Sequence, residues 1–285
     1  MSTVTVGQEN STPIELYYED HGSGPAVVLL SGWPFGSRSW EPQVHALLAA
    51  GHRVITYDRR GFGESSRPTT GYDFDTLTAD LDRLLTHLDV RDVTLIGFSL
   101  GTGELVRYIG THGTDRLKAC VIIESLAPSF VKSDDNPGGV DEAGVAGVQQ
   151  AILDDRLAWL SGMLGDFLNL DDHLGKRVSE DTVRSMWNDG AAASPWATWA
   201  CPRTWLEDFG ADIKRIDIPT LIMHGTADRI LPLEGQGRRL HAALPDARYV
   251  EIEGGPHIMC VTHAAEVNRE VLAFLRQTAP VGAAA

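Results

Sequence analysis

The chain has 285 residues, a length that fits one large α/β domain with room for an insertion. Hydrophobic residues make up 43% and charged residues 22%, which is ordinary for a globular protein and excludes a disordered or fibrous chain. With 24 basic and 39 acidic residues the net charge is −15, so phosphate backbones and anionic lipid surfaces would repel the chain, and neither nucleic acid nor membrane partners are expected.

The cysteines and the first residues of the chain give an expectation about its cellular location. Cys120, Cys201 and Cys260 are far apart and odd in number, so they form neither a metal spacing nor a disulfide framework; this suits a reducing compartment and predicts a cytoplasmic location. Residues 1–10 lack a basic segment followed by an apolar run, so no signal peptide is expected. No apolar stretch approaches the roughly 20 residues that a membrane span needs.

The first 123 residues alternate short β-branched runs with longer amphipathic segments. Residues 26–30 form a continuous apolar run, which is typical of a strand covered on both faces. Such alternation predicts a mostly parallel sheet wrapped by helices. Strands are predicted at 4–6, 14–19, 26–30, 53–57, 93–98 and 119–123, and helices near 44–48, 74–88 and 100–109.

The alternation stops between residues 127 and 212, where no strand is predicted and helical patterns cover 151–164 and 180–187. It returns with strands at 219–224 and 249–252 and helices at 233–244 and 267–274. We therefore expect an α/β core of residues 1–126 and 213–279, interrupted by a helical cap insertion of residues 127–212, and a frayed tail at 280–285. Five of the seven tryptophans lie in the insertion: Trp159, Trp187, Trp196, Trp199 and Trp205.

One motif carries chemistry. Gly97-Phe98-Ser99-Leu100-Gly101 fits G-x-S-x-G and lies between a predicted strand and a predicted helix. In that context the turn exposes the serine hydroxyl, the glycines let strand and helix approach closely, and the N-terminus of the helix favours developing negative charge. Ser99 is therefore the candidate nucleophile.

A serine hydroxyl needs a base, and the base needs an orienting acid. His257 follows the last predicted strand in a Gly-Gly-Pro-His loop, which can aim an imidazole at the elbow. Asp228 follows the strand at 219–224 and completes the chain order serine, acid, histidine. Glu124, at the end of the strand before the insertion, competes for the same role, although Asp228 is preferred.

The oxyanion hole should use the N–H of Leu100, the residue after the nucleophile, and an N–H from the loop after the strand at 26–30. In Ser31-Gly32-Trp33-Pro34, Trp33 supplies that N–H, because Pro34 cannot donate. The Trp33 side chain could equally be an aromatic plug between loop and cap, and the two roles are compatible.

Other patterns are interpreted as structural. Residues 58–65 resemble a phosphate-binding glycine loop but lack the following lysine or a third glycine at dinucleotide spacing, so we interpret them as a tight turn tied by the Asp58 and arginine side chains. No cofactor and no metal site is expected, because the histidines are scattered. Those without partner spacing include His112, His173, His241 and His263.

Taken together, these segments resemble an α/β-hydrolase, and most closely the cofactor-free bacterial haloperoxidase (perhydrolase) and aryl esterase branch. The resemblance implies a Ser99, Asp228, His257 triad with Trp33 and Leu100 as oxyanion donors, hydrolysis of an acyl ester, and hydrogen peroxide as a possible replacement for water. The motifs that carry it are Ser-Gly-Trp-Pro at 31–34, Tyr-Asp-Arg-Arg-Gly-Phe-Gly-Glu-Ser at 57–65, Gly-Phe-Ser-Leu-Gly-Thr-Gly-Glu at 97–104, Tyr-Ile-Gly-Thr-His-Gly at 108–113 and Gly-Gly-Pro-His at 254–257.

This chain departs from that branch beside the triad. Members usually have Met and Gly where this chain has Leu100 and Thr102, and Gly where it has Ile258, whose branched side chain predicts a narrower pocket. The tryptophans of the insertion either roof a pocket for an aromatic acyl group or form the insertion's own small core. Candidates for the pocket lining are Phe35, Leu126, Trp159, Trp187, Ile230 and Ile258.

The sequence therefore predicts a serine hydrolase acting on a small acyl substrate. Lactonase, thioesterase and C–C bond hydrolase activities use the same triad and stay open, as does a non-catalytic small-molecule binding protein. Epoxide hydrolases and haloalkane dehalogenases are disfavoured, because they need an aspartate where this chain has Ser99. The sequence sets neither the substrate nor the oligomeric state.

Overall fold

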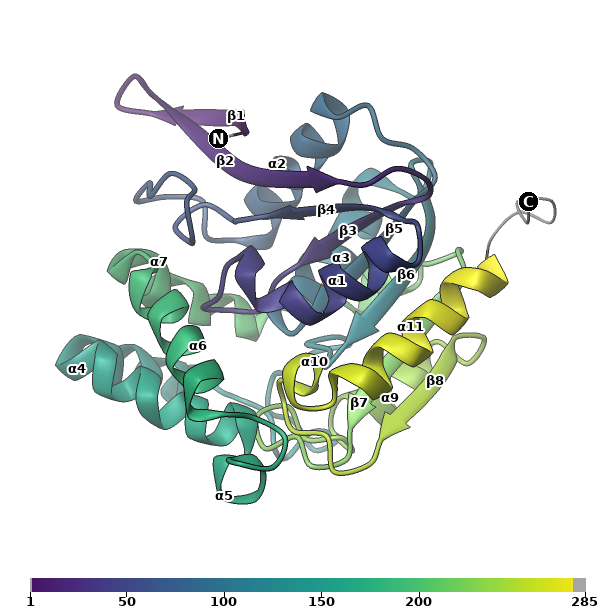
Figure 1. Cartoon of the computed structure of the whole chain (residues 1–285). Coiled ribbons are helices and arrows are strands. Elements are labelled where there is room, and N and C mark those ends of the chain that lie inside the picture. The colour runs from purple at the N-terminus through teal and green to yellow at the C-terminus, as the bar shows by residue number, and fades with distance from the viewer. Residues whose placement is uncertain (1, 279–285) are drawn as a thin grey trace.

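The computed structural model describes residues 2–278, and its core is an eight-stranded sheet (Figure 1). The strand order is β1-β2-β4-β3-β5-β6-β7-β8; at one edge β1 pairs antiparallel with β2 and β2 pairs antiparallel with β4, and the other neighbours run parallel. The predicted mostly parallel sheet is confirmed. Its strands are β1 (Thr3–Glu9), β2 (Thr12–His21), β3 (Ala26–Leu30), β4 (Arg53–Tyr57), β5 (Val93–Phe98), β6 (Leu117–Ile123), β7 (Thr220–Gly225) and β8 (Arg248–Ile252).

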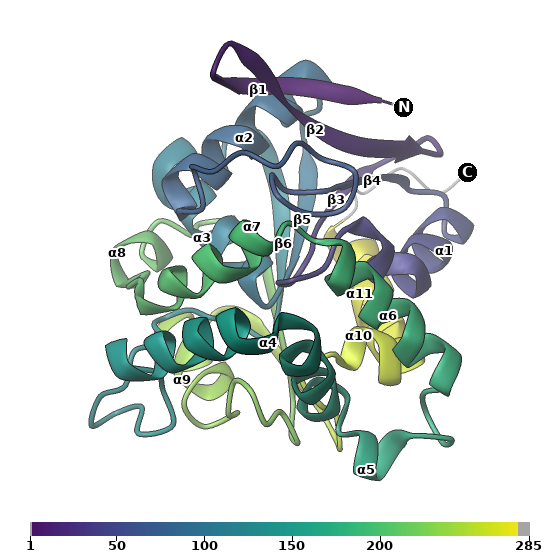
Figure 2. The ribbon, with the colours of Figure 1, turned by 90° about the vertical axis from the view of Figure 1, so that its left-hand side faces the viewer.

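Helices cover both faces of the sheet, with α1 and α11 on one face and α2 and α3 on the other (Figure 2). The predicted leucine stripe of α2, which includes Leu77, Leu81 and Leu84, is buried against the core. The helices of the core are η1 (Ser37–Trp40), α1 (Glu41–Ala49), α2 (Phe74–His87), α3 (Leu100–His112), α9 (Gly237–Ala243), α10 (Met259–Thr262) and α11 (Ala264–Thr278).

Strand β5 lies at the centre of the sheet between β3 and β6, and every one of its residues is buried. Both of its faces are covered by helices, which explains why its sequence is apolar without the alternation of a half-exposed strand. The residue that follows β5, Ser99, therefore emerges in the middle of the sheet's carboxyl edge. The loops that follow β3, β6 and β7 reach the same edge, because these strands run parallel to β5.

The segment between β6 and β7 is helical, and within the described residues it contains only isolated β-bridges and no strand. Figure 1 shows α4, α6 and α7 gathered at one end of the sheet. Trp159 of α4 packs on Trp33, which follows β3, with ring centroids 5.2 Å apart, so the inserted helices cover the carboxyl edge. They are α4 (Glu142–Leu168), α5 (Leu170–His173), α6 (Glu180–Ala192), α7 (Pro195–Ala200), η2 (Cys201–Leu206) and α8 (Gly210–Ile213).

Helix α4 is interrupted at Asp155, whose backbone is extended (φ −158°, ψ 92°). The Asp155 carboxylate accepts the N–H groups of Leu157 at 3.1 Å and Ala158 at 3.0 Å, so it caps a second helical segment. That second segment carries both Trp159 and Phe167 to the carboxyl edge of the sheet.

One predicted helix begins later than expected, and one predicted segment lies outside the described residues. The helix predicted at 233–244 begins only at Gly237, because residues 232–236 form a turn that closely approaches Asn136. The tail predicted to fray, residues 280–285, lies outside the described residues. Among the residues that are described, no helix has the length and apolar character to cross a membrane.

Because α3 and β3 are in close contact, we expect that a side chain at Gly101 would destabilise the protein. A Cβ added to Gly101 would lie 2.2 Å from the carbonyl oxygen of Leu30, whereas one added to Gly165 in α4 would meet nothing within 4 Å. We expect Gly101→Ala to lower the free energy of unfolding by about 1–3 kcal/mol through overpacking. The control Gly165→Ala should raise it by up to about 1 kcal/mol through helix propensity. Urea denaturation followed by circular dichroism checks both, and equal stabilities for the two variants would contradict the argument.

Candidate active site

Ser99 forms a sharp elbow between β5 and α3. Its backbone lies at φ 52° and ψ −119°, a conformation that is strained for a residue with a side chain. Two neighbouring glycines make the turn possible, because a Cβ on Gly97 would lie 2.6 Å from the carbonyl oxygen of Gly101, and Gly101 in turn faces Leu30. The elbow predicted from G-x-S-x-G is thus present, and Ser99 retains 8% exposure.

His257 lies beside Ser99, with its Nε2 3.0 Å from the serine Oγ, and it is fully buried. The loop that carries His257 is tied to the loop after β7, because Ala227 donates its N–H to the carbonyl of Gly255 at 3.0 Å. Phe167 from α4 packs against the imidazole with ring centroids 4.6 Å apart. The ring is therefore held between the core and the inserted helices.

Asp228 lies on the other side of the imidazole, with Oδ2 2.8 Å from Nδ1 of His257. Its other oxygen accepts the N–H groups of Ile230 at 2.7 Å and Leu231 at 2.9 Å. Burial alone would raise the pKa of this carboxyl group, but the charge and hydrogen bond of His257 outweigh it and lower the pKa to about 2. Asp228 is therefore a charged acceptor at any ordinary pH.

Glu124, the alternative acid, lies behind Asp228 rather than beside His257. Its Oε1 accepts the N–H of Gly225 at 2.9 Å, and its Oε2 lies 3.1 Å from Nε2 of His224. Burial, with the nearby Asp228 charge adding to it, raises the pKa of Glu124 well above its ordinary value. Within residues 2–278, Glu124 makes no hydrogen bond to His257, so the geometry favours Asp228 as the acid.

Glu124, His224 and Asp228 also bring possible metal-ligand atoms within 4.8 Å of one another. Each residue is already engaged, however. The Oδ2 of Asp228 contacts His257, Nε2 of His224 lies 2.8 Å from the Leu231 carbonyl, and Glu124 holds the Gly225 amide. We interpret the cluster as a buried hydrogen-bonded layer that supports Asp228.

The two amides expected to form an oxyanion hole lie close to Ser99. Leu100 is the first residue of α3, and the loop carrying Trp33 passes over the elbow so closely that a Cβ on Gly32 would lie 3.2 Å from Cβ of Ser99. In the described part of the chain, neither the Trp33 N–H nor the Leu100 N–H donates a hydrogen bond. Both are thus available to an oxygen bound beside Ser99.

The Trp33 side chain is a buried part of the contact with the inserted helices. It packs on Trp159, and it meets Trp205 edge-to-face with ring centroids 5.3 Å apart. The aromatic plug considered from the sequence is therefore observed, and it leaves the backbone N–H of Trp33 free.

Most pocket candidates lie around this site. Ile258 is buried and donates its N–H to the carbonyl of Phe167 at 3.0 Å, and Phe35 meets the Phe167 ring with centroids 6.2 Å apart. The Leu126 N–H donates to Oγ1 of Thr102 at 3.0 Å, and Thr102 in turn donates to the Ser99 carbonyl at 2.6 Å. Trp159 reaches the same site by packing on Trp33, and Ile230 does so by donating its N–H to Asp228.

Trp187 is the exception, because the structure does not bring it to the site. Its indole N–H donates to Oγ of Ser161 at 3.0 Å, and its ring lines a separate hollow of about 300 Å³ between α4 and α6. On α6 the buried residues are Met186 and Gly190, which lie one turn apart on the face toward the core. Trp187 is about 100° around the helix from that face.

Phe167 was missed by the sequence analysis. It contacts both His257 and Phe35, and its carbonyl accepts the Ile258 N–H. Phe167 lies in the last turn of α4, 90 residues before His257 in the sequence, so nothing local indicated the contact.

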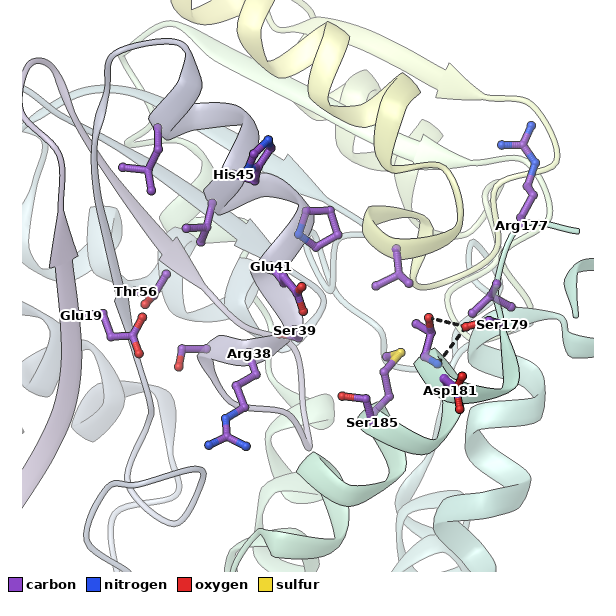
Figure 3. A pocket seen from close by; sticks show the side chains of 18 residues that line it. Glu19, Arg38, Ser39, Glu41, His45, Thr56, Arg177, Ser179, Asp181 and Ser185 are labelled. Atoms are coloured by element: carbon purple, nitrogen blue, oxygen red, sulfur yellow. Dashed lines mark hydrogen bonds between the residues drawn. The ribbon is translucent and has the colours of Figure 1, made fainter. Parts of the chain in front are cut away.

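A larger groove lies beside η1 and α6, and Figure 3 shows the side chains that line it. Its volume is about 1130 Å³, and its rim includes Arg38 and Ser39 from η1 and Asp181 and Ser185 from α6. None of Ser99, Asp228 and His257 lines this groove. The Ser99 site itself is closely packed under the inserted helices.

Comparison with known proteins agrees with the geometry. A protein of Synechocystis sp., provisionally named a non-heme chloroperoxidase, is 49% identical over 97% of this chain and 100% of its own length. A bifunctional esterase/perhydrolase of Acinetobacter calcoaceticus is 29% identical over 92% of this chain and 96% of its own. The crystal structure of a bromoperoxidase from Bacillus anthracis has a TM-score of 0.92 and 45% identity, covering 96% of this chain and 99% of that one.

The family model described as the alpha/beta hydrolase fold matches residues 25–264, which include the whole of the site described above. The chain belongs to the α/β-hydrolase family, with non-heme haloperoxidases and esterases among its relatives.

Proposed function

We propose that this protein is a cofactor-independent serine hydrolase that cleaves a small acyl ester through Ser99, His257 and Asp228. One observation carries the proposal: a continuous chain of contacts, 2.8 Å from Asp228 to His257 and 3.0 Å from His257 to Ser99, that ends at a strained elbow. These three groups in this order are those that nucleophilic acyl transfer needs.

In the first half of the reaction, the Ser99 Oγ attacks the carbonyl carbon of the ester while its proton passes to Nε2 of His257. The carbonyl oxygen becomes an oxyanion, which accepts hydrogen bonds from the N–H groups of Trp33 and Leu100. Collapse of this intermediate breaks the bond to the alcohol oxygen, and His257 returns the proton to the leaving alcohol. The carboxylate of Asp228 keeps the Nδ1–H tautomer of His257 and stabilises the imidazolium.

In the second half, a water molecule gives a proton to His257 and attacks the carbonyl carbon of the acyl group on Ser99. The bond from that carbon to the Ser99 Oγ then breaks, His257 returns the proton to the Oγ, and the carboxylic acid is released. Hydrogen peroxide can replace water, in which case the product is a peracid. The peracid then oxidises bromide in solution to hypobromous acid and is itself reduced to the carboxylic acid. This second route is supported by the haloperoxidase and perhydrolase relatives.

We also propose that residues 127–212 act as a cap that excludes water and shapes the acyl pocket. Contacts of Trp159 with Trp33 and of Phe167 with His257 support this role. These aromatic contacts and the buried branched side chain of Ile258 leave little space beside Ser99. The acyl group should therefore be small. Three free, buried cysteines support the proposed cytoplasmic location.

The first prediction concerns the nucleophile. We expect Ser99→Ala to lower the kcat for p-nitrophenyl acetate by a factor on the order of 10³ or more, because the acyl-enzyme cannot form. The thermal unfolding curve should stay that of a folded protein. A variant that keeps more than a tenth of the wild-type kcat would eliminate the serine mechanism, and a wild type without ester turnover would favour a binding protein.

The second prediction decides between the two buried acids. Asp228→Asn should lower kcat by roughly 10²–10⁴, since asparagine cannot hold the required tautomer of His257. Glu124→Gln should cost far less, because Glu124 makes no hydrogen bond to His257 among the described contacts and glutamine has nearly the same shape. Steady-state kinetics on the two variants checks this. The reverse order of losses would assign the acid to Glu124.

The third prediction concerns peroxide chemistry. Bromination of monochlorodimedone should require a carboxylic acid, so it should proceed in acetate buffer and fall to background in phosphate. It should disappear with Ser99→Ala, because the acyl-enzyme is the intermediate, and it should be unaffected by EDTA. Equal rates in acetate and phosphate, or loss of activity with EDTA, would rule out this route.

A further inference from the structure

The loop that carries the Trp33 amide, residues 31–37, is held in place by hydrogen bonds at both ends. Within the loop, Phe35 donates its N–H to the Gly32 carbonyl at 3.1 Å, and Oγ of Ser31 donates to the Gly36 carbonyl at 3.0 Å. Ser37 donates its N–H to Oδ1 of Asp58 at 2.6 Å. From the inserted helices, Asp189 accepts the N–H of Gly36 at 3.0 Å.

Arg59 holds the start of this loop. Its Nη2 donates to the Ser31 carbonyl, and its Nε donates to the Glu104 carboxylate. Tyr57, the last residue of β4, donates its hydroxyl to the other oxygen of Glu104. As the sequence suggested, Asp58 ties the turn, accepting the Glu64 N–H at 2.8 Å. Arg59, in contrast, leaves the turn and binds the loop after β3 and helix α3.

Burial makes this arrangement demanding. Arg59 is 4% exposed and Glu104 is fully buried, so each charge needs its partner and neither can turn toward water. An arginine fork suits the position because its nitrogens bind a carboxylate and a carbonyl at the same time in a fixed plane. A lysine could neutralise Glu104, but its single nitrogen could not keep both contacts in the same geometry.

Glu104 lies one helical turn after Leu100, at i and i+4 on the same side of α3. The connection Leu100–α3–Glu104–Arg59–Ser31 therefore links the helix that carries one amide to the loop that carries the other. The Trp33 amide lies two residues beyond the anchored Ser31 carbonyl. A displacement of that loop would change the distance between the two donors and not the position of Ser99.

We propose that Arg59 is a positioning residue for the oxyanion hole, fixing the loop that carries Trp33 relative to the helix that carries Leu100. The inference rests on the proposed function, because it assigns Arg59 a role in stabilising the oxyanion of acyl transfer. Arg59 touches neither Ser99 nor His257 in the described contacts, and it acts through Ser31.

The next residue offers a matched control. Arg60 is equally buried, at 4% exposure, and forms a bidentate pair with Asp80 at 2.7 and 2.8 Å. Its remaining hydrogen bond is to the Thr70 carbonyl at 3.2 Å, and among the described contacts it makes none to residues 31–37. Breaking either arginine pair should cost stability, but only Arg59 is bound to the loop at 31–37.

The experiment compares Arg59→Lys with Arg60→Lys in the full chain, with p-nitrophenyl acetate as substrate, at a temperature where both variants are folded. We expect Arg59→Lys to lower kcat by about tenfold or more with KM within about twofold, since the lost interaction acts in the transition state. Arg60→Lys should keep kcat within about twofold of the wild type, even if it unfolds at a lower temperature.

A second readout isolates the oxyanion. A trifluoromethyl ketone adds to Ser99 as a tetrahedral oxyanion, so its inhibition constant should rise in Arg59→Lys by about the factor by which kcat falls, and stay unchanged in Arg60→Lys. If Arg59→Lys does not fold, Glu104→Gln, which keeps the shape but removes the charge that holds Arg59, is measured in its place.

Equal kcat in the two lysine variants, or a fall in kcat without a change in the inhibition constant, would overturn the positioning role. Failure of the proposed function is recognised separately, because the wild type would then show no turnover that depends on Ser99.

Discussion

The site depends on how closely α3 approaches β3. The Gly101 Cα faces the Leu30 carbonyl with no room for a side chain, and Gly97 faces the Gly101 carbonyl in the same way. This contact strains Ser99 into its positive φ, directs the start of α3 at the carboxyl edge of the sheet, and brings the loop after β3 across the elbow. The nucleophile and both free amides therefore meet because of one backbone packing constraint.

Two buried carboxyl groups near one another have opposite electrostatic fates. Burial would raise the pKa of Asp228, but the charge and hydrogen bond of His257 lower it, whereas burial and the neighbouring Asp228 charge together raise the pKa of Glu124. Such a separation favours the charged form of Asp228 beside the imidazole and the protonated form of Glu124 behind it. Both are buried carboxyl groups, so the difference between their pKa values comes from their neighbours: a histidine beside Asp228 and a negative charge beside Glu124.

The buried polar contacts around the site come from elements far apart in the chain. Arg59 follows β4, Glu104 lies on α3 and Ser31 follows β3, while Asp189 reaches the same loop from α6. Arg59, Glu104 and Ser31 are buried and Asp189 is half-buried, so the buried groups must find partners inside the protein, and these partners define one arrangement of the loop. The oxyanion loop is thus held by the core on one side and by the inserted helices on the other.

The sequence by itself determined the parts that depend on local spacing. Alternating apolar runs predicted the strands of the sheet and the helices around it. G-x-S-x-G predicted the elbow at Ser99, because the strained turn and its close glycine packing depend on consecutive residues. The order of Ser99, Asp228 and His257 after successive strands placed all three at one edge. These signals are local, and parallel strands carry them to a common place.

Tertiary structure alone decided what depends on contacts between distant segments. It separated Asp228 from Glu124 by distance to His257, brought Phe167 onto the imidazole, and turned Trp187 away from the site. It also joined Arg59 to the loop at 31–37. Helical periodicity shows that a residue lies on a face, but it cannot show what that face meets. In this protein, the packing of the inserted helices over the carboxyl edge of the sheet decided which of their side chains reach the site.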